Sequence, residues 1–109
     1  MDSLSPTGRY RVTTHSEEVR AAQWVDIPKI WDTVTDEVIA DLDGDRARGG
    51  GLWSLDRVRW TGNAQAVLTL RRFPGVRPHV EAIVDCGGEA AMVRGRRYPL
   101  RDLLAALEA

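Results

Sequence analysis

The sequence predicts an α+β fold: an antiparallel sheet of about five strands with helices packed on one face. Strand-forming residues fill positions 52–94, and three tight-turn sequences divide this stretch into a meander of four strands. An apolar stripe of helical period precedes the meander at 26–42, and a second follows it at 99–107. The expected order is therefore strand, helix or helices, four-strand meander and C-terminal helix, within one domain of residues 1–109.

The N-terminal part should contain the first strand of the sheet. Residues 1–8 are polar and contain Ser, Pro and Gly, so we expect them to be frayed. Residues 9–15 alternate between apolar and polar side chains, as in a half-buried strand. For residues 16–25 a short capped helix and a second strand fit almost equally well, and the sequence leaves the two open.

A longer helix is predicted over residues 26–42, where it should cover the sheet. Asp26 can cap it, and Pro28 falls in the first turn, where a missing N–H costs nothing. Gly44 would end the helix, and residues 45–51, rich in Arg and Gly, are expected to form a flexible connector. The apolar stripe of this helix consists of Ile27, Ile30, Trp31, Val34, Val38 and Leu42.

The turns of the meander decide which side chains share a face. A two-residue turn at 87–88 sets Val84 opposite Ala91, and this register gives the last hairpin one apolar face. In the first hairpin a three-residue turn at 61–63 separates apolar from charged side chains, whereas a two-residue turn mixes them. The side chains then expected on the core face are Leu52, Val58, Trp60, Ala64, Ala66, Leu68 and Leu70.

The opposite face of the first hairpin is the predicted partner-binding surface. It combines arginines with two large aromatic side chains, which is the composition of interface hot spots. Its residues are Trp53, Arg57, Arg59, Arg71 and Phe73. Because monomers rarely expose such a patch, we expect the protein to form a homo-oligomer, most simply a homodimer, through this face.

The C-terminal helix is expected to begin at Pro99 and to carry its leucines on one side. Leu100, Leu103, Leu104 and Leu107 follow the i, i+3, i+4, i+7 spacing of a helical stripe. A helix of about ten residues is marginal on its own, so it must dock on the sheet. We therefore expect Leu103 and Leu104 to be buried.

The composition of the whole chain narrows its class. The chain has 109 residues and a formal net charge of -1, so no global field attracts it to nucleic acid or to a membrane. Its single cysteine can form neither an internal disulfide nor a zinc-binding cysteine pattern. The first residues do not resemble a signal peptide, and no apolar run approaches transmembrane length. We expect a cytoplasmic protein with no membrane partner.

No catalytic residue, metal site or cofactor is predicted. Cys86 and His79 are separated by an odd number of positions, so on one strand they point to opposite faces and cannot pair as nucleophile and base. Cys86 is expected in the core, and His15 as a solvated or edge histidine without an evident partner. The acids of residues 41–45 resemble a calcium loop, but the Gly and the final Glu that such a loop needs are misplaced or missing.

The predicted function is a small non-catalytic intracellular adaptor or regulatory module that binds protein and itself. An alternative is nucleic-acid binding through the densest basic cluster, which consists of Arg94, Arg96, Arg97 and Arg101. The chain also resembles small RNA-cutting toxins in its expected order of strand, helices and meander, which makes an RNase-like toxin a third alternative by analogy. No motif of such a toxin is matched, and no acid–base pair supports that chemistry.

Overall fold

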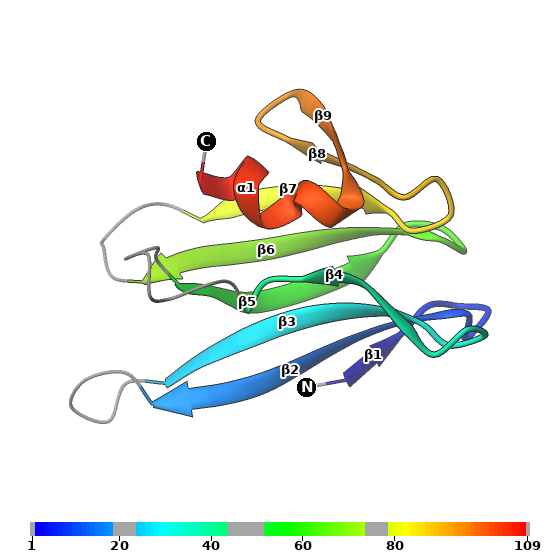
Figure 1. Ribbon diagram of the computed structural model, residues 1–109, viewed down its shortest axis with the longest axis horizontal. Helices are drawn as coiled ribbons and strands as arrows, with labels where there is room; N and C mark the ends of the chain where they lie inside the picture. The colour runs from blue at the N-terminus through cyan, green and yellow to red at the C-terminus, as the bar shows by residue number, and fades with distance from the viewer. Residues whose placement is uncertain (1, 19–23, 44–51, 74–78, 109) are drawn as a thin grey trace.

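Antiparallel β-sheets account for most of the structure, a computed structural model that describes residues 2–18, 24–43, 52–73 and 79–108 (Figure 1). The first sheet has the strand order β1-β2-β3-β4, and the second has the order β5-β6-β7-β8-β9. The first sheet contains β1 (Asp2–Leu4), β2 (Tyr10–Glu18), β3 (Trp24–Asp32) and β4 (Glu37–Asp41). The second contains β5 (Leu52–Trp60), β6 (Gln65–Phe73), β7 (Val80–Asp85), β8 (Ala90–Val93) and β9 (Arg96–Pro99). A 3-10 helix, η2 (Leu100–Asp102), and a short α-helix, α1 (Leu103–Glu108), follow.

The predicted helix over 26–42 is wrong, because this segment forms β3, a tight turn and β4. The turn is stabilised by the carboxylate of Asp32, which accepts a hydrogen bond from the Val34 N–H at 2.9 Å. Ile27 and Ile30 are both fully buried although they point to opposite sides of β3. A strand buried on both sides thus produced the three-residue spacing that resembles a helix. The fold is therefore mostly β, with two sheets in place of one sheet covered by helices.

The N-terminal residues are also more ordered than the sequence predicts. Residues 2–4, expected to be frayed, pair with β2 as strand β1. Ser5 is buried, and its hydroxyl oxygen accepts a hydrogen bond from the N–H of Tyr10 at 3.1 Å. For the segment left open, the strand alternative holds at both ends, since β2 reaches Glu18 and β3 starts at Trp24. Residues 19–23 and the predicted connector 45–51 lie outside the described residues.

The predicted meander is present, with one strand more. The last predicted hairpin has the expected register, with Val84 opposite Ala91. After it, Arg94 and Gly95 form a tight turn with φ values of 52° and 77°, and β9 then pairs with β8. In the first hairpin Trp60 pairs with Ala66 rather than Ala64, and this shift of two residues keeps Trp60 and Ala66 on the same face, as predicted.

A β-bulge at Asp56 reverses the predicted faces for the first half of β5. Leu55 pairs with Leu70, whereas Arg57 already pairs with Thr69, so Asp56 is an extra residue in β5. As a result Trp53 and Leu55, each 2% exposed, join the core, although the predicted alternation places them on the opposite face. The bulge explains why the predicted partner-binding surface loses its largest aromatic residue.

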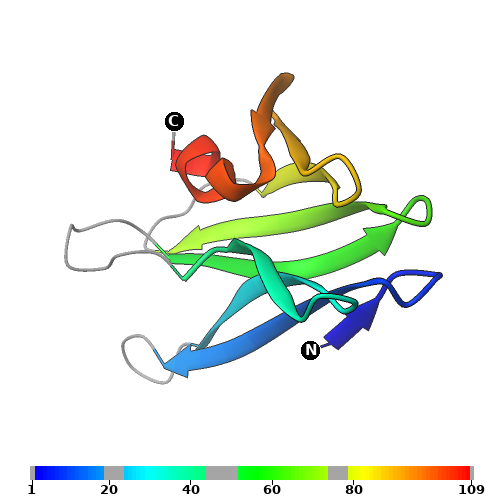
Figure 2. The ribbon, with the colours of Figure 1, turned by 45° about the vertical axis from the view of Figure 1, so that its right-hand side comes forward.

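One hydrophobic core connects both sheets to the C-terminal helices. Its fully buried members include Ile30 of β3, Leu68 of β6 and Leu103 of α1. The helices η2 and α1 lie on one side of the five-stranded sheet, beside β4 (Figures 1 and 2). The burial of Leu103 confirms that the C-terminal helix docks, whereas Leu104 is only half-buried. Among the described residues, no helix is long and apolar enough to span a membrane.

Candidate functional site

The outer face of the five-stranded sheet carries a row of side chains that crosses all five strands. Each neighbour in the row is the direct cross-strand partner of the next. From β5 to β9 the row reads Arg59, Val67, Ile83, Met92 and Arg97. Two arginines therefore flank three apolar side chains, and we call this set the cross-strand row.

Two of the three apolar side chains of the row are accessible to solvent, whereas Val67 is buried. Ile83 is 38% exposed and Met92 is 42% exposed, and both rank among the large apolar side chains that the fold leaves outside its core. η2 and α1 cover the opposite face of the sheet (Figure 2). Contiguous apolar patches often mark interaction sites, and Ile83 and Met92 are direct cross-strand neighbours on this face.

Acidic side chains of β7 lie on the same face, on either side of the row. Glu81 and Asp85 each lie two positions from Ile83, so the alternation of the strand points all three the same way. A groove of about 280 Å³ lies on the Glu81 side, and a smaller one of about 140 Å³ lies on the Asp85 side. The larger groove is lined by Arg57, Arg59, Val67, Thr69 and Glu81. The smaller is lined by Gln65, Ile83, Asp85, Ala90, Ala91, Met92 and Arg97. The face thus has the form of a cross, with arginines on one arm and acids on the other.

The structure separates the five predicted partner-binding residues. Arg57 and Arg59 are exposed on the outer face and line the larger groove. Arg71 is half-exposed and lies 3.9 Å from the carboxylate of Asp56 at the bulge. Trp53 is in the core, and Phe73 packs against the core at the end of β6. The arginines remain at the surface, but the aromatic anchors of the predicted interface are replaced by Ile83 and Met92.

The four arginines of the predicted nucleic-acid site do not share one surface. The guanidinium of Arg94 donates a hydrogen bond to the carbonyl oxygen of Leu107 at 3.3 Å, which stabilises the C-terminal end of α1. Arg96 and Arg97 are consecutive on β9 and point to opposite faces of the sheet. Arg101 is exposed on η2. Only Arg97 belongs to the cross-strand row.

The four-stranded sheet has an outer row of its own. It runs from β1 to β4 through Leu4, Arg11, Trp31 and Val38. The Arg11 guanidinium lies 5.9 Å from the centre of the Trp31 ring, and its Nε is buried without a hydrogen-bond partner among the described residues. The Trp31 indole N–H also donates to the Thr13 hydroxyl at 2.9 Å. This row contains a basic residue and no acid, so it offers less charge complementarity than the cross-strand row.

Cys86 is placed as the sequence predicts. It is 1% exposed and belongs to the core. Burial, followed by the negative charges of Asp85 and Asp32, raises the pKa of its thiol to about 12. A thiol of this kind stays protonated near neutral pH and is a poor nucleophile. His79 instead has its ring Nε2 2.5 Å from a carboxylate oxygen of Asp56.

Sequence reasoning missed the surroundings of His15. The prediction gave this histidine no partner, yet its Nε2 lies 3.3 Å from Glu17 and 3.5 Å from Asp43. Glu17 could have been found, because alternation on β2 places it on the same face as His15. Asp43 comes from beyond β4, and only the pairing of the first sheet brings it near.

No family model matches the chain, and no curated protein or solved structure resembles it at a significant level.

Proposed function

We propose that this protein is a non-catalytic protein-binding module that pairs with a second copy of itself through the outer face of the five-stranded sheet. The observation that carries this proposal is the arrangement of charges around Ile83. Arg59 and Arg97 end the cross-strand row, while Glu81 and Asp85 lie along β7 at right angles to it. A second copy rotated by a quarter turn presents acids where the first presents arginines.

The spacing of the two arms supports this pairing. Neighbouring strands lie about 4.8 Å apart, so each terminal arginine is about 10 Å from Ile83 across the sheet. Each acid is two residues away along β7, or about 7 Å. The difference of about 3 Å is within the reach of an arginine side chain. Sheets that pack face to face at near right angles are a known arrangement, and they would place the two arms in register.

A two-fold axis makes the contacts reciprocal. One possible axis bisects the angle between the direction from Ile83 to Arg59 and the direction from Ile83 to Glu81. Arg59 of each copy then meets Glu81 of the other, and Arg97 meets Asp85. The apolar side chains of Ile83 and Met92 then lie at the centre, shielded by a rim of ion pairs, as in many protein interfaces. If the axis is perpendicular to this one, the two acids change places, so that Arg59 meets Asp85 and Arg97 meets Glu81.

The experiment measures the mass of the particle in solution by sedimentation velocity over a range of concentrations. The wild type should be a dimer, and Ile83→Asp should dissociate it, because a charge placed at the centre must be desolvated without a partner. Val34→Asp is the matched control, since Val34 is 72% exposed in the turn before β4 and lies away from this face. It should leave the dimer unchanged.

Charge exchange tests the orientation of the two copies. Arg59→Glu and Glu81→Arg should each weaken the dimer by about tenfold or more, since each creates like-charge contacts in both halves of the interface. The double variant should restore it. If the other axis applies, Arg59→Glu combined with Asp85→Arg restores it instead.

Three results would overturn the proposal at different levels. A wild type that stays monomeric up to about 1 mM has no significant self-affinity. A dimer that tolerates Ile83→Asp uses another surface. A dimer that is restored by neither double variant is not held by the crossed charges. The expected cytoplasmic location remains a prediction, and fluorescence microscopy of the labelled protein in cells would test it.

A further inference from the structure

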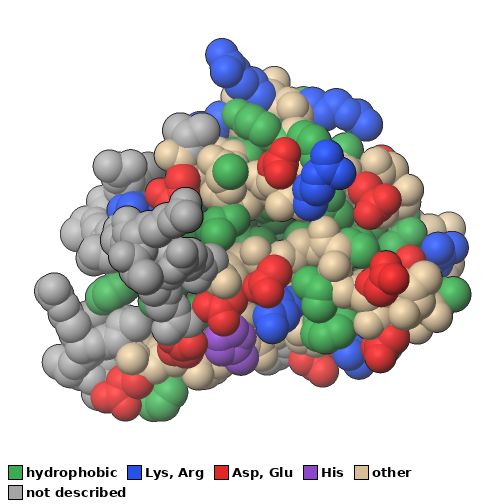
Figure 3. All heavy atoms as spheres, viewed as in Figure 1, with side chains coloured by type: hydrophobic (Ala, Val, Ile, Leu, Met, Phe, Trp, Pro, Cys, Tyr) green, Lys and Arg blue, Asp and Glu red, His purple; other side chains and the backbone are tan. Residues whose placement is uncertain are grey.

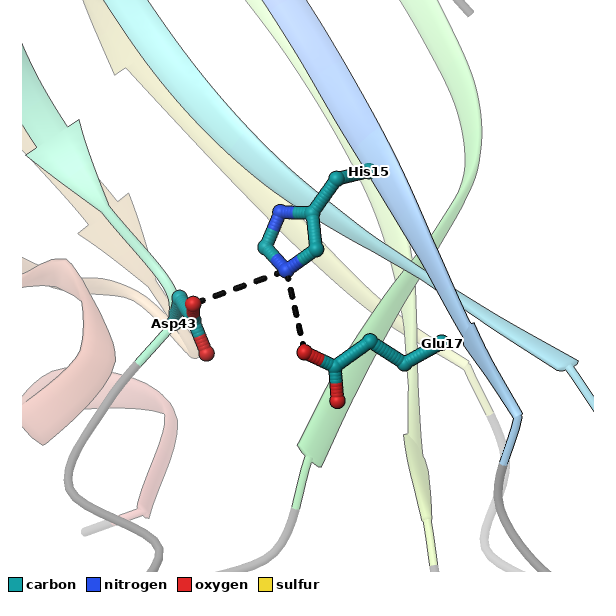
Figure 4. Close-up of side chains that lie close together, drawn as sticks. All are labelled: His15, Glu17 and Asp43. Carbon is teal, nitrogen blue, oxygen red and sulfur yellow. Dashed lines mark hydrogen bonds and ion pairs between the residues drawn. The ribbon is translucent and has the colours of Figure 1, made fainter.

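We propose that His15, Glu17 and Asp43 form a binding site for a divalent transition-metal ion such as Zn²⁺. This site is separate from the self-association face, since it lies on the four-stranded sheet. Figure 4 shows the three side chains converging from two segments of the chain, with both carboxylates directed at the same ring nitrogen. We call these residues the His15 cluster.

The backbone holds the three ligands from two separate strands. His15 and Glu17 are two residues apart on β2, so they point to the same side. Asp43 follows β4, where the Leu42 N–H donates to the carbonyl of Pro28 at 3.1 Å and continues the pairing with β3. The Asp43 N–H donates to the carboxylate of Asp41 at 2.8 Å, which fixes the chain at this point. The cluster therefore spans β2 and the end of β4 with β3 between them.

The distances agree with a tetrahedral ion. Nε2 of His15 lies 3.3 Å from Oε1 of Glu17 and 3.5 Å from Oδ2 of Asp43. Ligand atoms that bind zinc at about 2.1 Å in tetrahedral geometry are about 3.4 Å from one another. One ligand atom from each of the three residues lies within 4.8 Å of the other two, so only a small closure of the two carboxylates is needed.

The chemistry of the cluster also favours a cation. Imidazole with carboxylates is a ligand set that suits zinc and its neighbours, whereas calcium and magnesium prefer oxygen alone. Two carboxylate oxygens within 4.8 Å of one another create a negative potential that favours a cation between them. Figure 3 shows a histidine at the surface with acidic side chains and one basic side chain beside it.

The competing account is a simple ion pair. A protonated His15 could satisfy both carboxylates without any metal, and the three side chains would then only link β2 to the end of β4. The two accounts differ in what a metal titration shows, because a protonated histidine offers no lone pair to a metal. The predicted site has three protein ligands, which leaves a fourth position for water or a small anion.

The test is a titration of the full chain, freed of metal by a chelator and then dialysed, with Zn²⁺ in a calorimeter. One ion should bind per chain, and Co²⁺ should give the visible absorption of a four-coordinate site. His15→Gln should weaken binding at least about 100-fold, because it removes a direct ligand rather than a supporting residue. Asp43→Asn should weaken it in the same direction.

His79→Gln is the matched control. His79 also contacts a carboxylate, that of Asp56, but in a pair rather than in a group of three. This variant should bind Zn²⁺ like the wild type. Circular dichroism and a thermal melt, both without metal, show whether His15→Gln and Asp43→Asn are folded. If Asp43→Asn does not fold, the zinc affinity of His15→Gln alone tests the proposal. Absence of zinc binding by the wild type at about 1 mM, equal binding by His15→Gln, or an equal loss in His79→Gln would each overturn the proposal.

Discussion

Removing the Trp53 side chain should cost more stability than any other tryptophan truncation in the described residues. Trp53 is 2% exposed, and a buried tryptophan removes about 150–250 Å² from water. At about 25 cal/mol per Å² this corresponds to about 4–6 kcal/mol, which is an upper estimate because the unfolded chain is not fully extended. Truncations of this kind cost about 3–5 kcal/mol, so we expect about 4 kcal/mol for Trp53→Ala.

The hydrogen bond of the indole adds little to this figure. The Trp53 Nε1 donates to Oε1 of Glu108 at 2.9 Å, but that carboxylate also lies 3.3 Å from the guanidinium of Arg72. Loss of the indole therefore leaves Glu108 paired. Trp53→Phe, which keeps most of the packing and loses the N–H, should cost only about 1–2 kcal/mol.

Urea denaturation followed by far-UV circular dichroism measures these differences without relying on tryptophan fluorescence. Trp24→Ala is the control, because Trp24 is 57% exposed at the start of β3 and its loss should change stability by less than about 0.5 kcal/mol. If Trp53→Ala is too unstable to fold, Trp53→Phe remains measurable. A Trp53→Ala variant as stable as Trp24→Ala would refute the bulge-based placement and return Trp53 to the surface.

Four further predictions test other parts of the molecule. Leu103→Ala should lower the free energy of unfolding by about 2–5 kcal/mol and Leu104→Ala by clearly less, because only Leu103 is fully buried. Urea titrations measure both losses, and equal losses would contradict the prediction. Because burial raises the pKa of Cys86 to about 12, the native thiol should react slowly with iodoacetamide near neutral pH, and rapid alkylation would show that it is accessible. An unfolded thiol ionises near pH 9.0, so stability should fall as the pH rises from there towards 12, and Cys86→Ala should remove that fall. If the nucleic-acid alternative holds, changing Arg96 and Arg97 to Ala should lower the salt slope of binding by up to about two; a wild type that binds no probe at low salt in fluorescence anisotropy rules this alternative out.

Part of the outer face could be predicted from local sequence. Two turns of the meander follow from Gly and Asn residues at 61–63 and 87–88, and the last hairpin register follows from the two-residue turn at 87–88. With Val84 opposite Ala91 on the apolar face, alternation puts Ile83 on the other face, where the structure places it beside Met92. The geometry of a turn depends on a few adjacent residues, and it sets which residues of the two strands pair. Alternation along a short strand then gives the face of each side chain, so this prediction needs no information about distant contacts.

The bulge at Asp56 left a signal in the sequence that the prediction did not use. The apolar residues of β5 change parity there, from Trp53 and Leu55 to Val58 and Trp60, and this change is the sequence signal of an extra residue. Strict alternation through Asp56 ignored the signal and moved Trp53 to the wrong face. One residue thus decided whether Trp53 lies on the outer face or in the core.

By itself the sequence determined the turn at 87–88, the register of its hairpin and the leucine stripe of the C-terminal helix, because each depends on residues close together in the chain. Only the tertiary structure decided that residues 26–42 form a strand pair. Ile27 and Ile30 have helical spacing, but both are fully buried although they point to opposite sides of β3, so burial rather than local propensity set the pattern. The approach of Asp43 to His15 was decided in the same way, because it requires β3 to lie between β2 and β4 in one sheet.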